Sequence, residues 1–321
     1  MINEVRNAVL SVLNKNNYGY ISPSDFNLYA ANAQMEIFEE YFSSYNKVIN
    51  AENGRVPSGQ VAGGSISGTD YADIESPIAE TLEIFLKTDY LAKINTKSFS
   101  VPTVVTVGDY AYYILKILSY PNILTTGTNT SINTFQLIDS NASFLSDGIS
   151  VGDIVANITT GAVTNVASVF SNTIINLDLD SFLASGDQYK IYLNAPKETE
   201  KVSVGKITMI NNSNLTKPSN IFPSYTLEGE AISIYPSAIN NKGQVQAVYF
   251  RFPKTPKWTY VTLVSGDPAF SQSQPDYQDF ELSLNDGYKL VTKILEYCGI
   301  SIREPLVTQF GMTQEQQQQS Q

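Results

Sequence analysis

Residues 98–105, SFSVPTVV, and residues 111–120, AYYILKILSY, mark the point where the chain changes from helical to strand-forming sequence. Both stretches are rich in β-branched and aromatic side chains, which favour strands. Strand-like sequence resumes at 201–210, 230–236 and 244–252. We therefore expect an antiparallel β layer after residue 97.

Residues 121–195 form a self-contained segment within this β region. Short strand-like runs are separated there by turn signals at Asp147-Gly148, Gly152-Asp153 and Gly186-Asp187. Short strands at this spacing are typical of a small barrel or sandwich. The pattern predicts an inserted small β domain at 121–195, with residues 1–120 and 196–321 forming the surrounding helical and β domain.

Helical sequence lies on both sides of the β region. Apolar residues at helical spacing predict helices over 2–14, from Ser22 to about Asn46, over 77–93, and in a last helix that ends at Gly299. The predicted fold class is α+β. It consists of a helical domain, with a helical hairpin plus further helices, an antiparallel β layer and the inserted barrel or sandwich.

The bend between the first two helices, NKNNYGYISPSD (14–25), imitates a calcium loop of the EF-hand type. Asn14, Asn16 and Tyr18 fall on ligand positions one, three and five, and Asp25 falls on position twelve. Only Asp25 carries a charge, and it also completes a helix start led by Ser22. We therefore interpret the stretch as a bend followed by a capped helix, without calcium.

Composition restricts the function. The 321 residues include no histidine, which removes the usual general base and the usual metal ligand, so we expect no enzyme, no cofactor and no metal. The single cysteine, Cys298, excludes an internal disulfide and is expected as a buried, inert thiol. The formal net charge of −11 argues against broad binding of phosphate backbones. No apolar run predicts a membrane span, and the N-terminus reads as a helix rather than a signal peptide.

Two further features have a functional and a structural interpretation. Aspartates in the 121–195 segment could ligate calcium or act as paired carboxylates, but turns favour aspartate for purely local reasons. They are Asp139, Asp147, Asp153, Asp178, Asp180 and Asp187. Trp258 could stack on a base or a sugar, whereas packing in a core or an interface is the interpretation we favour.

The order of these elements, together with four stretches of sequence, resembles the head–tail connector, or neck ring, proteins of short-tailed bacteriophages. The likeness is in particular to those of crAss-like phages infecting Bacteroidetes. The stretches are YGYISPSDFNLYAANAQMEIFEEYF (18–42), PSNIFPSYTLEGEAISIYP (218–236), YFRFPKTPKW (249–258) and DFELSLNDGYKLVTKILEYCGISIREPLVTQ (279–309). The resemblance covers most of the chain outside the 125–195 segment.

The resemblance implies a non-enzymatic virion protein, made in the host bacterial cytoplasm. Such proteins form a homo-oligomeric ring, commonly dodecameric, between the portal protein and other neck or tail proteins. DNA passes through the ring without sequence-specific binding. The assembly interface is expected to include Tyr18, Tyr20, Arg55, Lys254, Trp258, Arg303, Gln309, Phe310 and Met312.

Two other interpretations remain open. One is a different phage tail or head-decoration protein whose β insertion binds glycan or protein. The other is a carboxylate-dependent hydrolase that uses the aspartates of the insertion.

Overall fold

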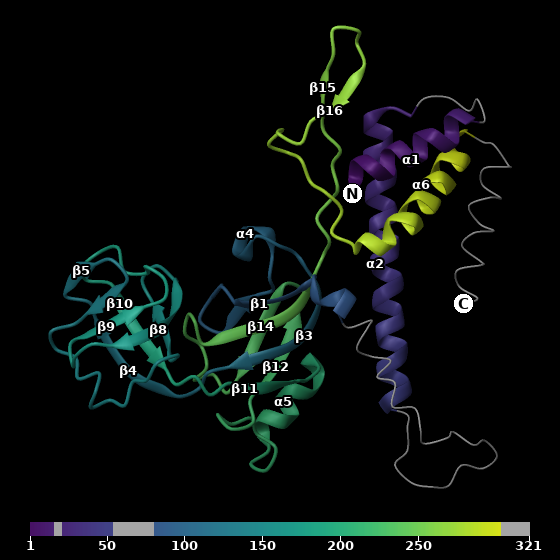
Figure 1. The fold of residues 1–321 in the computed structure, drawn as a ribbon. Helices are drawn as coiled ribbons and strands as arrows, with labels where there is room; N and C mark the ends of the chain where they lie inside the picture. The colour runs from purple at the N-terminus through teal and green to yellow at the C-terminus, as the bar shows by residue number, and fades with distance from the viewer. Residues whose placement is uncertain (16–20, 54–79, 303–321) are drawn as a thin grey trace, which may run out of the picture. The chain divides into compact units, whose positions relative to one another are not determined.

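The computed structural model describes residues 1–15, 21–53 and 80–302. The chain divides into two compact units. Unit 1 comprises Met1–Phe85 and Pro253–Gln321, and unit 2 comprises Leu86–Phe252. Unit 2 is therefore an insertion in the sequence of unit 1, and each unit is described by itself (Figure 1).

The predicted fold class is wrong, because the fold is mostly β rather than a helical domain with a β layer. Unit 2 is built on two seven-stranded sheets, and unit 1 adds a two-stranded sheet beside its helices. The predicted helix over 77–93 is helical only at 80–83 among its described residues, and strand β1 (Leu86–Tyr90) follows. Pairing with the distant strand β14 (Val245–Arg251) overrides the local helical pattern there.

Two stretches that were predicted as strands are partly helical. The run at 201–210 lies mostly in helix α5 (Val204–Asn212), which begins after Ser203. The run at 98–105 begins as strand β2 (Ser98–Ser100) and then enters the short helix α4 (Val104–Val107). Alternating apolar residues do not separate a short strand from a short helix, so tertiary packing decides.

The first sheet of unit 2 is mixed rather than purely antiparallel. Its strands, in sheet order, are β1, β14, β3 (Ala111–Ser119), β11 (Lys197–Lys201), β12 (Ser224–Glu228), β13 (Ala231–Tyr235) and β2. The β11–β12 pair is parallel, and the other pairs are antiparallel. A parallel pair needs a crossover connection, and α5 lies in the segment that joins β11 to β12.

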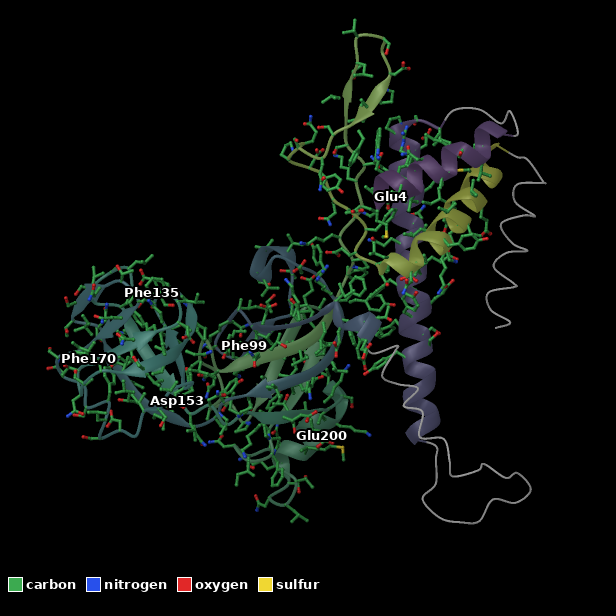
Figure 2. All side chains as sticks on the ribbon, in the orientation of Figure 1. Glu4, Phe99, Phe135, Asp153, Phe170 and Glu200 are labelled. Atoms are coloured by element: carbon green, nitrogen blue, oxygen red, sulfur yellow. The ribbon has the colours of Figure 1, made fainter. Side chains whose placement is uncertain are left out.

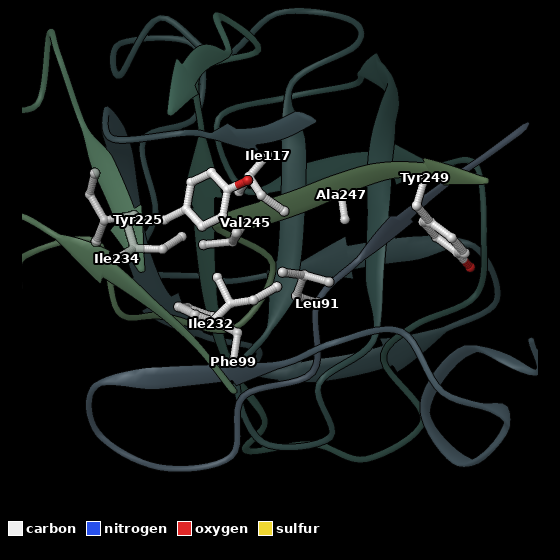
Figure 3. Packing of buried hydrophobic residues seen from close by; sticks show 10 residues of the cluster. Leu91, Phe99, Ile117, Tyr225, Ile232, Ile234, Val245, Ala247 and Tyr249 are labelled. Carbon is white, nitrogen blue, oxygen red and sulfur yellow. The ribbon is translucent and has the colours of Figure 1, made fainter. Parts of the chain in front are cut away.

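One apolar cluster holds this sheet together (Figure 3). Its members come from β2, β3, β12, β13 and β14, from the residue after β1 and from the connection between β13 and β14, and they are nearly fully buried. They are Leu91, Phe99, Ile117, Tyr225, Ile232, Ile234, Ile239, Val245, Ala247 and Tyr249. Ile232 and Ile234 alternate with Ser233 and Tyr235 along β13, so Ser233 and Tyr235 face away from the cluster.

The second sheet lies between Ile123 and Tyr192 and has its own core. Its strands, in sheet order, are β4 (Ile123–Thr128), β10 (Gln188–Tyr192), β7 (Ile154–Asn157), β8 (Val163–Val169), β9 (Ile174–Leu177), β6 (Gln136–Ile138) and β5 (Ser131–Asn133). The predicted turn glycines Gly148, Gly152 and Gly186 all have positive φ, as such turns require. Figure 2 shows Phe135 and Phe170 at the surface of this sheet, where they are 49% and 72% exposed.

A small buried cluster joins the two sheets inside unit 2. Tyr120, at the end of β3, packs with Ile154, Ala156 and Tyr192 of the second sheet. The Tyr192 hydroxyl donates to the main-chain oxygen of Lys242 at 3.1 Å. The two sheets therefore share contacts as well as chain connections.

Unit 1 contains the long helices. Helices α1 (Ile2–Lys15) and α2 (Pro23–Asn53) both pack on α6 (Gly287–Ile302), which follows the short 3-10 helix η1 (Leu284–Asp286). The predicted start of α2 is confirmed, because the Ser22 Oγ accepts from the Asp25 N–H at 3.1 Å and donates to its carboxylate at 2.6 Å. In the described residues no helix is long and apolar enough to cross a membrane.

Candidate assembly surface

The structure describes two of the nine predicted interface residues. Tyr18, Tyr20, Arg55, Arg303, Gln309, Phe310 and Met312 lie outside the described residues. Lys254 and Trp258 lie in unit 1, on the segment that leads from unit 2 into a β-hairpin. These two residues therefore direct attention to that hairpin.

The main chain at Lys254 is fixed to α2 while its side chain stays exposed. The Lys254 carbonyl accepts from Gln34 Nε2 at 2.8 Å, and its N–H donates to Glu281 Oε2 at 2.7 Å. The Gln34 side chain in turn accepts from the Glu281 N–H at 3.0 Å. Gln34 thus joins the two segments that lead into and out of the hairpin.

Trp258 is a core residue of unit 1, only 2% exposed. Its indole Nε1–H donates to Asn3 Oδ1 on α1 at 3.0 Å. Its main-chain N–H donates to Asn27 Oδ1 on α2 at 2.8 Å, and the Asn27 amide returns a hydrogen bond to the Trp258 carbonyl at 3.1 Å. The ring is therefore closed to solvent and ties the base of the hairpin to two helices.

Other aromatic rings and one guanidinium group surround the Trp258 ring. It stacks on Tyr260 and on Phe270, with ring centroids 5.6 and 6.0 Å apart. The Arg6 guanidinium lies over its face, 3.8 Å from the centroid. Because Tyr260 and Phe270 begin and end the hairpin, this stack sets the position of both strands.

The hairpin itself consists of β15 (Tyr260–Thr262) and β16 (Pro268–Phe270), which pair only with each other. Figure 1 shows it as a narrow ribbon that extends away from the helices of unit 1. At its tip, Leu263 is 51% exposed and Val264 is fully exposed. We call residues 261–267 the hairpin tip.

The hairpin tip has a defined turn. The Leu263 N–H donates to the Asp267 carbonyl at 2.9 Å, and Gly266 takes φ +88°. This hairpin is not among the elements predicted from the sequence, although the Ser-Gly-Asp-Pro run at 265–268 is a turn signal between two short strand-like stretches. The exposed apolar residues Val261, Leu263 and Val264 lie together at this tip, which makes it a candidate contact surface.

A second group of exposed apolar side chains lies in unit 2, on α5 and the loop after it. They are Val204, Met209, Leu215, Ile221 and Phe222, and their exposed fractions run from 45% to 93%. The Phe222 N–H donates to Ser219 Oγ at 3.2 Å, which fixes the turn that carries Ile221 and Phe222. We call this group the α5 loop surface.

A half-buried charge cluster joins α2 to α6. Lys293, only 5% exposed, lies 2.9 Å from Glu36 Oε1 and 2.8 Å from Glu40 Oε1. The Tyr297 hydroxyl donates to Glu36 Oε2 at 3.0 Å, and burial, followed by this hydrogen bond, raises the pKa of Tyr297 to about 12. Each polar group has a partner inside the cluster, so its evident role is to fix α6 on α2.

Three of the six aspartates named for the second sheet have structural partners. Asp139 accepts from the Tyr189 hydroxyl at 2.7 Å, Asp153 from the Ser150 N–H at 2.8 Å, and Asp187 from Asn157 Nδ2 at 2.9 Å. All three are buried, whereas Asp178 and Asp180 are exposed. Across the residues that the structure describes, no group of three His, Cys, Asp or Glu side chains is placed to hold a metal ion.

A polar hollow of about 390 Å³ opens on the second sheet beside Asp139. It is lined mainly by hydroxyl, amide and carboxyl groups. The lining residues are Thr125, Thr126, Gly127, Thr128, Asp139, Asn141, Ala142, Ser143, Asp147 and Tyr189. A Cβ at Gly127 would lie 2.5 Å from both Asp139 Oδ2 and the Tyr189 hydroxyl, so glycine keeps this pair together.

Cys298 is buried in α6 at 1% exposure, and burial raises the pKa of its thiol to about 12. A thiol in that state is a poor nucleophile near neutral pH. In the imitation calcium loop, Asp25 is engaged by Ser22, while Tyr18 and its neighbours at 16–20 lie outside the described residues.

No protein-family model matches the chain, and no curated protein matches it.

Proposed function

We propose that the chain is a structural subunit of a phage virion, a head–tail connector that assembles into a ring between the portal and the tail. The observation that carries the proposal is the hairpin tip, an exposed apolar turn on a hairpin whose base is fixed by buried Trp258. Isolated two-stranded hairpins are marginal in water, and only the base of this one is anchored on the helices, so a partner that covered the apolar tip would stabilise it.

The second apolar group supports a ring in particular. A closed ring uses a heterologous interface, in which each subunit presents two different surfaces. The hairpin tip and the α5 loop surface are two such groups, one in each unit. Scattered exposed apolar residues are ordinary in soluble proteins, and the grouping of these residues is what favours an interface.

The charge of the chain agrees with a channel for DNA. With 31 acidic and 20 basic residues, the protein repels phosphate backbones on average. We propose that DNA passes through the ring without sequence-specific binding, and that the protein is non-enzymatic and located in the virion. The ring order commonly seen in the resembling proteins, twelve, is part of the proposal.

The test is assembly of the full chain, alone and with its portal protein, followed by native mass spectrometry and electron microscopy. The double variant L263S/V264S removes apolar area at the hairpin tip without touching the core. The matched control is L28S, on α2, because Leu28 is also more than half exposed. We expect rings from the wild type and L28S, and none or far fewer from L263S/V264S.

Two results would contradict the proposal in different ways. If L263S/V264S forms rings as well as the wild type does, the hairpin tip is not part of the interface, but the connector role still stands. A wild-type protein that forms no ring with its portal would contradict the connector role itself.

The polar hollow favours a second candidate, a different tail or head-decoration protein that binds glycan. Hydroxyl, amide and carboxyl groups such as Thr126, Asn141 and Asp147 are suited to sugar hydroxyls. Binding of the full chain to a glycan array, abolished by D147N and retained by D180N, would support it. Asp180 is an exposed aspartate of the same sheet region and does not line the hollow.

A further inference from the structure

A second pocket, of about 490 Å³, lies in unit 2 beside β13. Three separate segments form it: the turn before β2, the end of α5 with its following loop, and β13 with the residues after it. Its volume is within the range of small-molecule sites, roughly 300–1,000 Å³. It shares no lining residue with the polar hollow of the second sheet.

The charge of this pocket is opposite to that of the chain. Two lysines, Lys97 and Lys217, line it, and no aspartate or glutamate does, although acidic residues outnumber basic ones 31 to 20 overall. Within the described parts of the chain, neither ammonium group has an ion-pair or hydrogen-bond partner. The two positive charges are therefore available to an anion.

Neutral donors line the same pocket. Asn211, Ser233 and Ser237 line the pocket, and their side-chain donors are not used elsewhere in the described chain. Thr226 pairs with Ser233 across the β12–β13 ladder, so the two side chains share one face of the sheet. Among the described residues the buried Thr226 Oγ1 has no hydrogen-bond partner, and Thr226 is the cross-strand neighbour of the pocket residue Ser233.

Residues with rings also line the pocket. Pro218, Tyr235 and Pro236 contribute ring surfaces to the pocket. A ligand with an anionic group and a sugar or base ring would meet both kinds of wall: charge and donors for the first, ring faces for the second.

We propose that this pocket binds a phosphate monoester carried on a ring, which is the chemistry shared by mononucleotides and sugar phosphates. Lysines act on phosphate as point charges, and the oxygens of one phosphate accept from several donors at once. The pocket suits this chemistry, with two lysines from separate segments and amide and hydroxyl donors in the same lining. It shares no residue with the assembly surfaces described above, although Asn211, Lys217 and Pro218 belong to the same segment as the α5 loop surface.

Isothermal titration calorimetry on the full chain tests the proposal. Three probes are used: inorganic phosphate, adenosine monophosphate and glucose 6-phosphate. The test variant is K97Q/K217Q, and K206Q on α5 is the control, because Lys206 is exposed and does not line the pocket. We expect saturable binding that weakens by about a hundredfold in K97Q/K217Q, about tenfold for each lysine, and is unchanged in K206Q.

The two organic phosphates separate the sources of the ligand. Preference for adenosine monophosphate indicates a nucleotide, and preference for glucose 6-phosphate indicates a sugar phosphate. Equal heats of binding in the wild type, K97Q/K217Q and K206Q would show that the heat comes from a general ionic effect, and would overturn the proposal. Binding of a glutamate-rich peptide with no binding of any phosphate would also overturn it, in favour of a protein carboxylate.

Discussion

The contacts that stabilise unit 1 internally differ in kind from those that stabilise unit 2 internally. In unit 2, backbone ladders organise two sheets, and apolar clusters fill the space against them. In unit 1, side-chain hydrogen bonds and ion pairs also join segments more than 200 residues apart, as between Asn27 and Trp258 and between Glu36 and Lys293. The difference teaches that unit 1 depends on polar side chains to join segments that are far apart in sequence, where unit 2 uses backbone ladders as well.

That dependence follows from the order of the chain. The helices α1 and α2 come before unit 2, and α6 comes after it, so their contacts must be made across the whole insertion. Hydrogen bonds at fixed atoms specify one packing of helices, whereas apolar faces alone tolerate several. The predictions that follow compare a change in one unit with a matched change.

The largest effect is expected from W258A. Removing a large buried ring costs about 3–5 kcal/mol in the free energy of unfolding, and Asn3 and Asn27 lose partners or alignment as well. The variant F99A, in the apolar cluster of unit 2, is expected to cost a similar amount. Denaturant unfolding followed by circular dichroism measures both.

Hydrogen exchange separates these two variants. W258A should expose the amides of β15 and β16, because both strands depend on the aromatic stack, whereas F99A should leave them protected. Equal loss of protection in the hairpin from both variants would show that the two units do not differ in this way.

The next effect belongs to unit 2, at the contact between its two sheets. A Cβ at Gly243 would lie 2.6 Å from the Ala156 Cβ, and Gly243 also has φ +72°. G243A should therefore cost about 3 kcal/mol, from backbone strain plus overpacking. G229A is the control, because Gly229 has φ +60° with no atom near its missing Cβ, so only strain of about 1 kcal/mol applies. Similar melting temperatures for the two variants would contradict the close packing of the sheets.

A smaller effect is expected from K293M in unit 1. Glu36 and Glu40 would lose the buried ammonium between them, and we expect a loss of about 2 kcal/mol, reduced by the partial exposure of both carboxylates. K257M is the control, because the Lys257–Asp276 pair is about half exposed on both sides and should contribute less than about 1 kcal/mol. Urea titration of both variants shows whether burial makes the difference.

The smallest effect concerns pH and Asp279. Burial alone would raise the pKa of this carboxyl group, but N–H donors from Ile2 and Phe280 and the nearby Met1 amino group hold it below its usual 3.8. A group with a lowered pKa stabilises the fold above its unfolded pKa and loses that contribution as pH falls. Unit 1 should therefore weaken below about pH 4 by no more than about 1 kcal/mol, since the carboxylate is partly screened.

Two natural probes report this pH effect in unit 1 alone. Trp258 is the single tryptophan and Cys298 the single cysteine, and both are buried there. Tryptophan fluorescence should show a smaller loss of stability between pH 5 and about pH 3 in D279N than in the wild type. An identical pH dependence would mean that Asp279 does not contribute.

Local signals could be predicted from the sequence, and distant pairings could not. The cap at Ser22 and Asp25 and the turn glycines of the second sheet follow from residues within a few positions of each other. The end of the predicted 77–93 helix failed, because Leu86–Tyr90 becomes a strand only through pairing with β14. The fold class was wrong for the same reason, since the extent of a sheet depends on such pairings.

The candidate sites also combine residues that the sequence singles out with contacts that only the fold provides. Trp258 could be singled out as the only tryptophan, but its position under a hairpin depends on Asn3 and Asn27, which nothing nearby in the sequence indicates. Lys97 and Lys217 stand 120 positions apart (217 − 97), and only the fold brings them into one pocket. Distinctive residues can be recognised in the sequence, but the residues that lie next to them in space are known only from the fold.

The register of β1 and β14 has a consequence for how the chain closes on itself. Leu86 pairs with Phe250, so the chain enters and leaves unit 2 at one end of the same pair of strands. Once unit 2 folds, the long stretch between Phe85 and Pro253 acts as a short loop. The folding of unit 2 has then already brought the two ends of that stretch together, so joining the helices carries little further loop-closure entropy. The helices on either side of the insertion then meet as though they were close neighbours in sequence, which favours an order of folding in which the inserted unit comes first.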